Sequence, residues 1–98
     1  MSYTFTIRPE AEADLADAKR WYDGRREGLG ADFLLCIEGA LEKIRRNPAI
    51  YPVVYKDVRR ATVRRFPYGV FYRVVGQRII VLGVFHGRRD PRLWQSRA

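Results

Sequence analysis

The spacing of apolar residues changes once along the chain, at Asn47 and Pro48, and this change limits the folds that the sequence can adopt. Before it, apolar residues recur every three or four positions, as they do on one face of a helix. After it, β-branched and aromatic residues form short runs that are typical of strands. Because proline cannot continue a helix, the helical half should end here. The sequence therefore predicts an α+β domain in which the helices precede most of the sheet.

Two helices are predicted in the first half. Pro9 suits the first helical position and is followed by acidic residues, which places a helix at about Pro9–Arg25. Gly28 and Gly30 interrupt the pattern, and a second amphipathic helix is expected at about Leu29–Arg46, with basic residues in its last turn. The short break between them predicts an antiparallel helical hairpin.

One strand is expected before the helices and three after them. Residues 3–8 and 58–65 alternate between two faces, and two apolar runs follow at 68–75 and 78–86. A loop with glycine first, at 76–77, favours a type II′ hairpin between these runs. The last run is apolar at nearly every position, so it should be a central strand covered on both faces for part of its length.

The predicted architecture is strand, helix, helix and three strands, with the helical hairpin packed on one face of a small antiparallel sheet and the opposite face partly open. A length of 98 residues suits a single domain, 1–98. The sequence has no run of eighteen apolar residues and no signal-peptide pattern, so we expect a cytoplasmic protein that does not bind membranes. Cys36 lies within the second helical pattern and is expected to be a buried core residue.

Positive charge is concentrated in the second half of the chain. Residues 1–50 contain 8 Lys/Arg and 9 Asp/Glu, a net charge of −1, whereas residues 51–98 contain 11 and 2, a net charge of +9. A basic surface of this size attracts a polyanion or an acidic polypeptide, and charge alone does not distinguish them. The second half is therefore predicted to carry the binding surface.

The last apolar run leads into the only histidine, His86, and then into arginines and a tryptophan. Adjacent arginines on a strand point to opposite faces, so only one of each pair can serve a site on one face. A lone histidine without a second metal-ligating residue nearby does not predict a metal site, and we expect no metal or cofactor. The candidate residues for binding a target or partner are Arg60, Arg64, Arg65, His86, Arg88, Arg89, Arg92 and Trp94.

Several segments together resemble the ParE branch of the ParE/RelE toxin superfamily. They are "AEADLADAKRWY", "GLGADFL", "NP", "RRATVRRFPYGVFYRV" and "VFHGRRDPRLW", and the resemblance covers nearly the whole chain. Its most specific pieces are Arg65–Tyr68 and His86–Trp94. The superfamily comprises toxins of bacterial type II toxin–antitoxin modules, often described as plasmid stabilisation proteins.

The resemblance implies a toxin that inhibits DNA gyrase as a binding protein and is neutralised by a ParD-like antitoxin. An alternative is a RelE-like endonuclease that cuts messenger RNA on the ribosome, and a third is a module that only binds its antitoxin. Cutting RNA through a ribose 2′-hydroxyl needs groups that transfer protons and cations that stabilise the phosphorane, for which Arg65, Tyr72 and His86 are the candidates. Ribosome-dependent nucleases of this fold frequently carry a proton-transfer group such as tyrosine at the end of the last strand, and no tyrosine follows His86.

Overall fold

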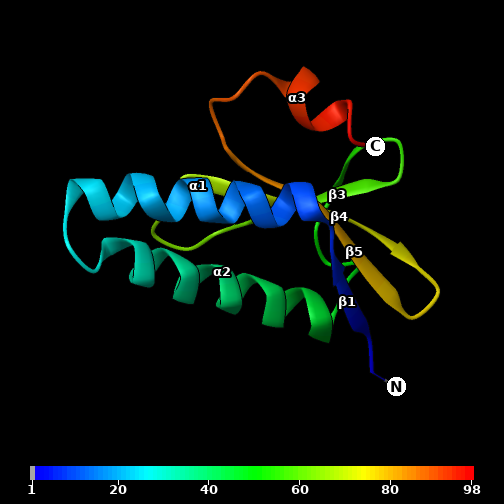
Figure 1. Cartoon of the computed structure of the whole chain (residues 1–98). Coiled ribbons are helices and arrows are strands. Elements are labelled where there is room, and N and C mark those ends of the chain that lie inside the picture. The colour runs from blue at the N-terminus through cyan, green and yellow to red at the C-terminus, as the bar shows by residue number, and fades with distance from the viewer. Residues whose placement is uncertain (1) are drawn as a thin grey trace.

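The computed structural model describes residues 2–98 and has the predicted α+β architecture (Figure 1). Both helices begin and end at the predicted residues, and a short third helix and an additional strand also form. The elements are β1 (Thr4–Ile7), α1 (Pro9–Arg25), α2 (Leu29–Arg46), β2 (Val53–Tyr55), β3 (Val58–Thr62), β4 (Tyr68–Val75), β5 (Arg78–His86) and α3 (Pro91–Gln95).

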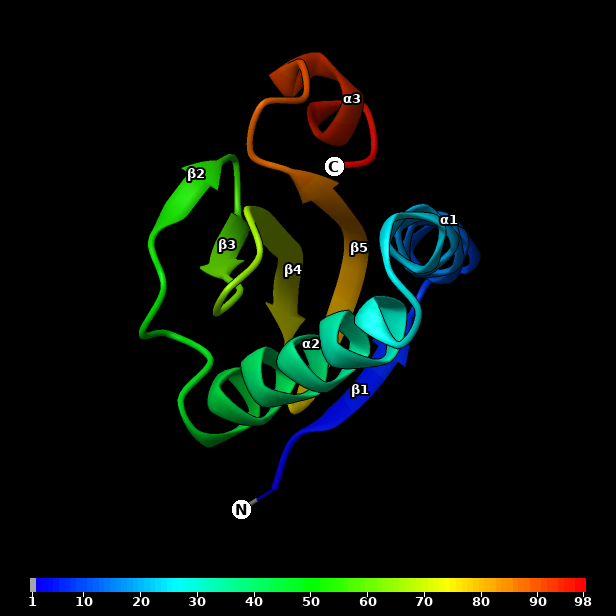
Figure 2. The same ribbon diagram turned by 90° about the vertical axis from the view of Figure 1, so that its left-hand side faces the viewer.

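The five strands form one sheet in the order β1-β5-β4-β3-β2. Neighbouring strands are antiparallel except at one edge, where β1 runs parallel to β5. The sheet is therefore mostly antiparallel, as predicted, with one parallel pair at this edge, where β5 returns alongside β1 after both helices and three strands. Strand β5 is an interior strand, between β1 and β4 (Figure 2).

Three segments differ from the predicted pattern. Strand β2 forms within a stretch expected to be a loop, and α3 forms within the tail that follows β5. Strand β3 ends at Thr62, so Arg64 and Arg65 belong to the connection to β4 and not to a strand. Arg65 has a φ of +72°, a left-handed conformation that is uncommon for residues other than glycine.

The helical hairpin covers one face of the sheet, as predicted, and the larger core lies between them. This helix-side core is built from apolar residues of both helices and from alternate residues of β3, β4 and β5. Cys36 packs against it but is only partly buried, so the expectation of a fully buried thiol is corrected. The largest fully buried residues of the helix-side core include Phe33, Ile44, Tyr72 and Ile79.

The opposite face carries a second, smaller core and is more covered than the sequence predicted. Val58, Phe71, Leu82 and Phe85 form this second core, and Trp94 packs against it from α3. The rings of Trp94 and Phe71 are stacked, with centroids 4.6 Å apart. Figures 1 and 2 show the chain leaving the end of β5 and folding back as α3. The expected coverage of β5 on both faces is thereby confirmed, and the C-terminal segment supplies it on this face.

The hairpin that joins β4 and β5 has the predicted two-residue loop. Val75 pairs with Arg78, and Gly76 between them has a φ of +59°. Gln77 does not share this positive φ, and this combination of signs is that of a type II′ turn.

Strand β5 contains a bulge at Leu82. Tyr72 pairs with Val81 and Phe71 with Gly83, which leaves Leu82 as an extra residue on β5. A Cβ on Gly83 would lie 2.6 Å from a carbon of the Phe85 ring and 2.7 Å from a guanidinium nitrogen of the C-terminal segment. The bulged stretch therefore accepts only glycine at this position without a local shift.

A tail clamp, which we define as the ion pair of Asp14 and Arg97, fastens the C-terminal segment beside the bulge. One Nη1–Oδ2 distance is 2.6 Å, and both side chains are largely buried. The same aspartate oxygen accepts the backbone N–H of Val84 at 2.9 Å, and Arg97 donates to the carbonyl of Leu82 at 3.2 Å. Strand β1 pairs with β5 only as far as Val81. Beyond Val81, the clamp supplies hydrogen-bond partners to the backbone of β5 at Leu82 and Val84.

Candidate functional site

Two open grooves flank the C-terminal segment and share four lining residues. The α1 groove, between α1 and this segment, has a volume of about 730 Å³. The β3–β4 groove, between the connection of β3 to β4 and the same segment, has a volume of about 470 Å³. Tyr68, Phe85, His86 and Arg89 line both grooves. The end of β5 is therefore the place where the two grooves meet.

His86 is held at this junction by its strand partner and by the turn that follows it. It lies opposite Tyr68 in the β4–β5 register, and the two rings meet edge to face at 5.4 Å. Its Nδ1 accepts the backbone N–H of Arg88 at 3.0 Å, and its carbonyl accepts that of Arg89, also at 3.0 Å. Since Nδ1 is an acceptor here, the neutral ring carries its proton on Nε2.

Tyr68 is a site residue that the sequence offered for base stacking but favoured as a core residue. Burial raises the pKa of its hydroxyl, and the nearby charge of Arg89 opposes that change in part. The hydroxyl therefore stays protonated and neutral at physiological pH. Aromatic residues in a strand usually belong to the core, and only the register with His86 reveals that Tyr68 also borders both grooves.

The β3–β4 groove brings together four of the predicted binding residues. Arg60 approaches from β3, and its aliphatic chain lies across Gly69, where an added Cβ would be 2.9 Å from the Arg60 Cγ. His86 and Arg89 border the groove from the end of β5 and the turn after it, and Trp94 borders it from α3. The wall beneath these polar groups is apolar and partly aromatic.

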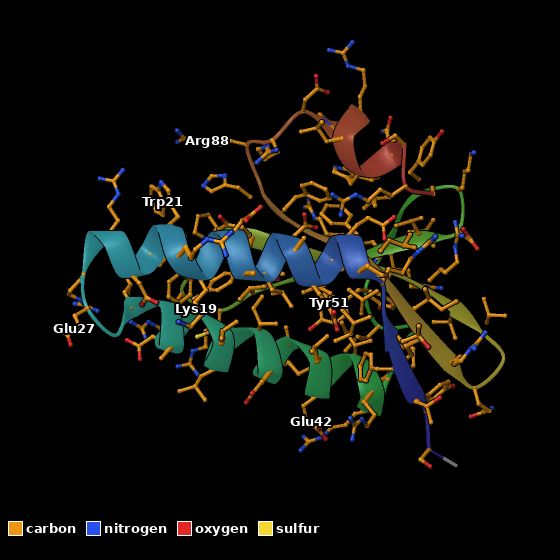
Figure 3. The ribbon with its side chains drawn as sticks, in the orientation of Figure 1. Lys19, Trp21, Glu27, Glu42, Tyr51 and Arg88 are labelled. Carbon is orange, nitrogen blue, oxygen red and sulfur yellow. The ribbon has the colours of Figure 1, made fainter. Side chains whose placement is uncertain are left out.

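The other four predicted binding residues lie outside both grooves. Arg65 turns toward α2, where its guanidinium is 3.9 Å from Asp32. Arg64 is exposed in the preceding turn, and Arg88 extends away from the body of the protein (Figure 3).

Arg92 is highly exposed, and its guanidinium hydrogen-bonds the carboxylate of Asp90 at 2.7 Å. Asp90 also accepts the backbone N–H of Arg92, as an N-cap of α3. These contacts lower the pKa of Asp90, with the side-chain hydrogen bond from Arg92 as the main cause. The pair is therefore a local structural feature of the tail.

Tyr72, a candidate for proton transfer in the nuclease alternative, is fully buried in the helix-side core. Its hydroxyl donates a hydrogen bond to the carbonyl of Pro48 at 2.6 Å, and burial raises its pKa to about 12. This placement corrects the expectation that the hydroxyl is available to a ligand. Arg65, Tyr72 and His86 lie in three different surroundings, beside α2, inside the core and at the groove junction.

The α1 groove has a mixed lining that the sequence did not predict. Asp14 and Asp17 lie on its helix side, together with Trp21, whose side chain is 54% exposed. Leu93 contributes a second exposed apolar side chain from the C-terminal segment. Figure 3 shows Trp21 projecting from α1 on the side where the tail passes. This groove therefore offers apolar surface between charged groups of both signs.

Within residues 2–98, no group of three or more histidine, cysteine or acidic side chains is placed to hold a metal ion. In the same range, no helix is long and apolar enough to cross a membrane.

Comparison with solved structures places this arrangement in a known structural class. The fold is similar to a chain of the chromosomal ParDE toxin–antitoxin system from P. aeruginosa, with a TM-score of 0.77, 20% sequence identity, and coverage of 86% of this chain and 95% of that one. It is also similar to a chain of the toxin–antitoxin complex RelBE2 from Mycobacterium tuberculosis, with a TM-score of 0.61, 22% identity, and coverage of 88% and 99%. The fold is thus that of the small α+β proteins of toxin–antitoxin systems.

Sequence comparison identifies the family. Residues 5–91 match the family described as ParE toxin of the type II toxin-antitoxin system parDE, and the chain belongs to this family. Toxin ParE2 of Mycobacterium tuberculosis is 26% identical over 92 residues, which are 93% of this chain and 88% of that protein. The resemblance noted from the sequence is confirmed.

Proposed function

We propose that this ParE-family toxin inhibits DNA gyrase by binding it, and that a ParD-like antitoxin neutralises it. The observation that carries the proposal is the family match over residues 5–91. The cationic end of β5, where His86 and Arg89 border two open grooves, supports it as a surface for a gyrase–DNA complex. The proposed action requires no cofactor and takes place in the cytoplasm, where it would stabilise the replicon that encodes the module.

The α1 groove supports the antitoxin part of the proposal. A segment that folds on binding needs apolar positions to bury, and Trp21 and Leu93 provide exposed apolar surface on opposite sides of this groove. Arg89 provides positive charge in the same groove, where Arg97 is already paired with Asp14. An acidic amphipathic segment matches both features.

One observation favours the alternative, a ribosome-dependent messenger RNA endonuclease. Tyr68, His86 and Arg89 bring a neutral hydroxyl, an imidazole and a guanidinium to one junction. These are groups that phosphodiester cleavage can use, although the trio differs from the predicted Arg65, Tyr72 and His86. Cleavage therefore has to be measured beside gyrase inhibition.

The deciding experiment compares two targets with one protein preparation. Purified toxin is titrated into a DNA supercoiling assay with gyrase and into a cell-free translation assay with mapped messenger RNA ends. We expect loss of supercoiling, intact messenger RNA, and relief of inhibition by the antitoxin. Cut messenger RNA with unaffected gyrase would support the endonuclease, and no effect in either assay would support a module that only binds its antitoxin.

A further inference from the structure

We propose that the β3–β4 groove binds single-stranded nucleic acid, with one unstacked base against its apolar wall and adjacent phosphates on Arg60 and Arg89. The proposal concerns the isolated toxin and does not rest on gyrase inhibition. Its starting point is the composition of the groove, which differs from that of the larger α1 groove beside it.

The charges of the groove favour a polyanion. Among the described residues that line it, Arg60 and Arg89 are cationic and none is acidic. The nearest carboxylate in sequence, Asp90, is hydrogen-bonded to Arg92 and so has its charge matched locally. The α1 groove, in contrast, has the carboxylates of Asp14 and Asp17 in its lining, and each of them forms an ion pair with an arginine.

The shape and the wall of the groove favour a single strand. Its volume of about 470 Å³ lies within the range of about 300–1,000 Å³ that small-ligand sites occupy, so it accommodates a base but not a duplex. Phe66, Pro67, Pro91 and Trp94 give it the apolar and aromatic lining on which unstacked bases pack. A duplex keeps its bases stacked and could use only the arginines.

The position of Arg60 is built into the sheet. Because Gly69 has no side chain, the aliphatic chain of Arg60 can lie directly across β4 at the rim of the groove. Residue 69 therefore acts as a positioning residue for this cation. Phosphates and bases are common to DNA and RNA, so their shared chemistry defines the ligand, and the test separates the two.

The test measures fluorescence anisotropy of labelled oligonucleotides of about ten nucleotides, a deoxyribose and a ribose version, at several salt concentrations from about 50 mM upward. For Arg60→Ala/Arg89→Ala we expect affinity for the bound strand to fall about tenfold or more, and the slope of log affinity against log salt to become shallower by about 1.4, since each phosphate contact contributes about 0.7. The matched control is Arg46→Ala/Arg78→Ala, which removes the same charge at exposed sites outside the groove. Equal losses of affinity in the two double variants would overturn the proposal. It would also be overturned if neither the deoxyribose nor the ribose oligonucleotide binds.

Two further measurements locate the strand. Trp21→Phe leaves Trp94 as the one tryptophan, and its emission should be quenched by the bound oligonucleotide. Gly69→Ala should weaken binding in the parent but not in the Arg60→Ala background, provided that each variant keeps the parent's thermal transition. Binding that leaves Trp94 emission unchanged would overturn the proposal.

A poly-glutamate peptide that binds with the same dependence on Arg60 and Arg89 would also overturn it, because the groove would then be a docking site for protein. Supercoiling assays on the same variants show separately whether gyrase inhibition persists.

Discussion

Arg88 and Arg89 are adjacent, but the structure gives them different surroundings. Arg89 lines both grooves and influences the pKa of Tyr68, whereas the Arg88 side chain extends into solvent and only its backbone contacts His86. The sequence predicted that only one of the pair would serve a site on one face, without indicating which. Both are exposed, and the turn after β5 distinguishes them by directing only Arg89 toward the grooves, which the sequence alone does not show.

We predict that changing Arg88 and Arg89 together to alanine weakens toxicity, and that Arg89→Ala accounts for most of the loss. His86→Gln should have a milder effect if gyrase binding is the mechanism, because no proton transfer is needed. Growth arrest on induction measures this, after each variant has shown the parent's thermal transition. If His86→Gln abolishes toxicity in a folded protein that cuts messenger RNA, the nuclease alternative is right, since loss of a general acid or base costs about 10² to 10⁴ in rate.

Tyr72 leads to a prediction about stability and pH. Tyr72→Phe removes the donor to the Pro48 carbonyl and should lower the free energy of unfolding by about 1–2 kcal/mol. The folded-state pKa of about 12 lies above the ordinary value of 10, so folding favours the protonated hydroxyl. Its contribution is complete below pH 10 and is lost as the pH rises toward 12. Urea unfolding across this alkaline range should therefore show a steeper loss of stability in the parent than in Tyr72→Phe, and parallel curves would contradict this.

At the scale of elements, the C-terminal segment is held by two contacts at different places. Trp94 stacks on Phe71 over the second core, and Arg97 forms the tail clamp with Asp14. Both grooves use this segment as one wall. Because Asp14 and Arg97 also line the α1 groove, the clamp stabilises the candidate site from within one of its walls.

We predict that Arg97→Gln or Asp14→Asn lowers the free energy of unfolding by about 2 kcal/mol, because each removes one charge from a largely buried ion pair and leaves the other charge without its counterpart. The double variant should cost less than the sum of the two. In hydrogen exchange, the amide of Val84, which donates to Asp14, should lose protection in Asp14→Ala, which removes the acceptor. Additive losses, or unchanged protection at Val84, would show that the clamp does not act as a unit.

The elements that sequence predicted well are those with a strong local pattern. Pro9, the glycines at 28 and 30 and Pro48 mark the helix ends, and Gly76 marks the hairpin. Strand β2 was missed because it has three residues and follows Pro52 directly. The parallel pairing of β1 and the contact of Tyr68 with His86 depend on partners distant in sequence, which periodicity does not specify. The Asp90–Pro91 start of α3 was a visible signal, but a helix of five residues is too short for periodicity.

At the scale of the whole molecule, the uneven charge and the exposed apolar side chains predict that the antitoxin is held both by charge attraction and by burial of apolar surface. Charge attraction between exposed groups is strongly screened at about 1 M salt, whereas burial of apolar surface persists. We therefore expect the complex with the antitoxin to remain associated at that salt, with slower association. Size-exclusion chromatography in low and high salt measures this. Complete dissociation by salt alone would show that apolar surface such as Trp21 and Leu93 is not buried in the complex.

The left-handed backbone conformation of Arg65 lowers the stability of the folded protein. A left-handed conformation costs a residue with a Cβ about 1–2 kcal/mol, and glycine avoids this while losing about 0.5–1 kcal/mol of chain entropy. Its exposed ion pair with Asp32 at 3.9 Å contributes little in return. Arg65→Gly should therefore raise the free energy of unfolding by about 0.5–1 kcal/mol in a urea titration. An Arg65→Gly toxin that is more stable but less potent would show that the arginine contributes to activity at the expense of stability.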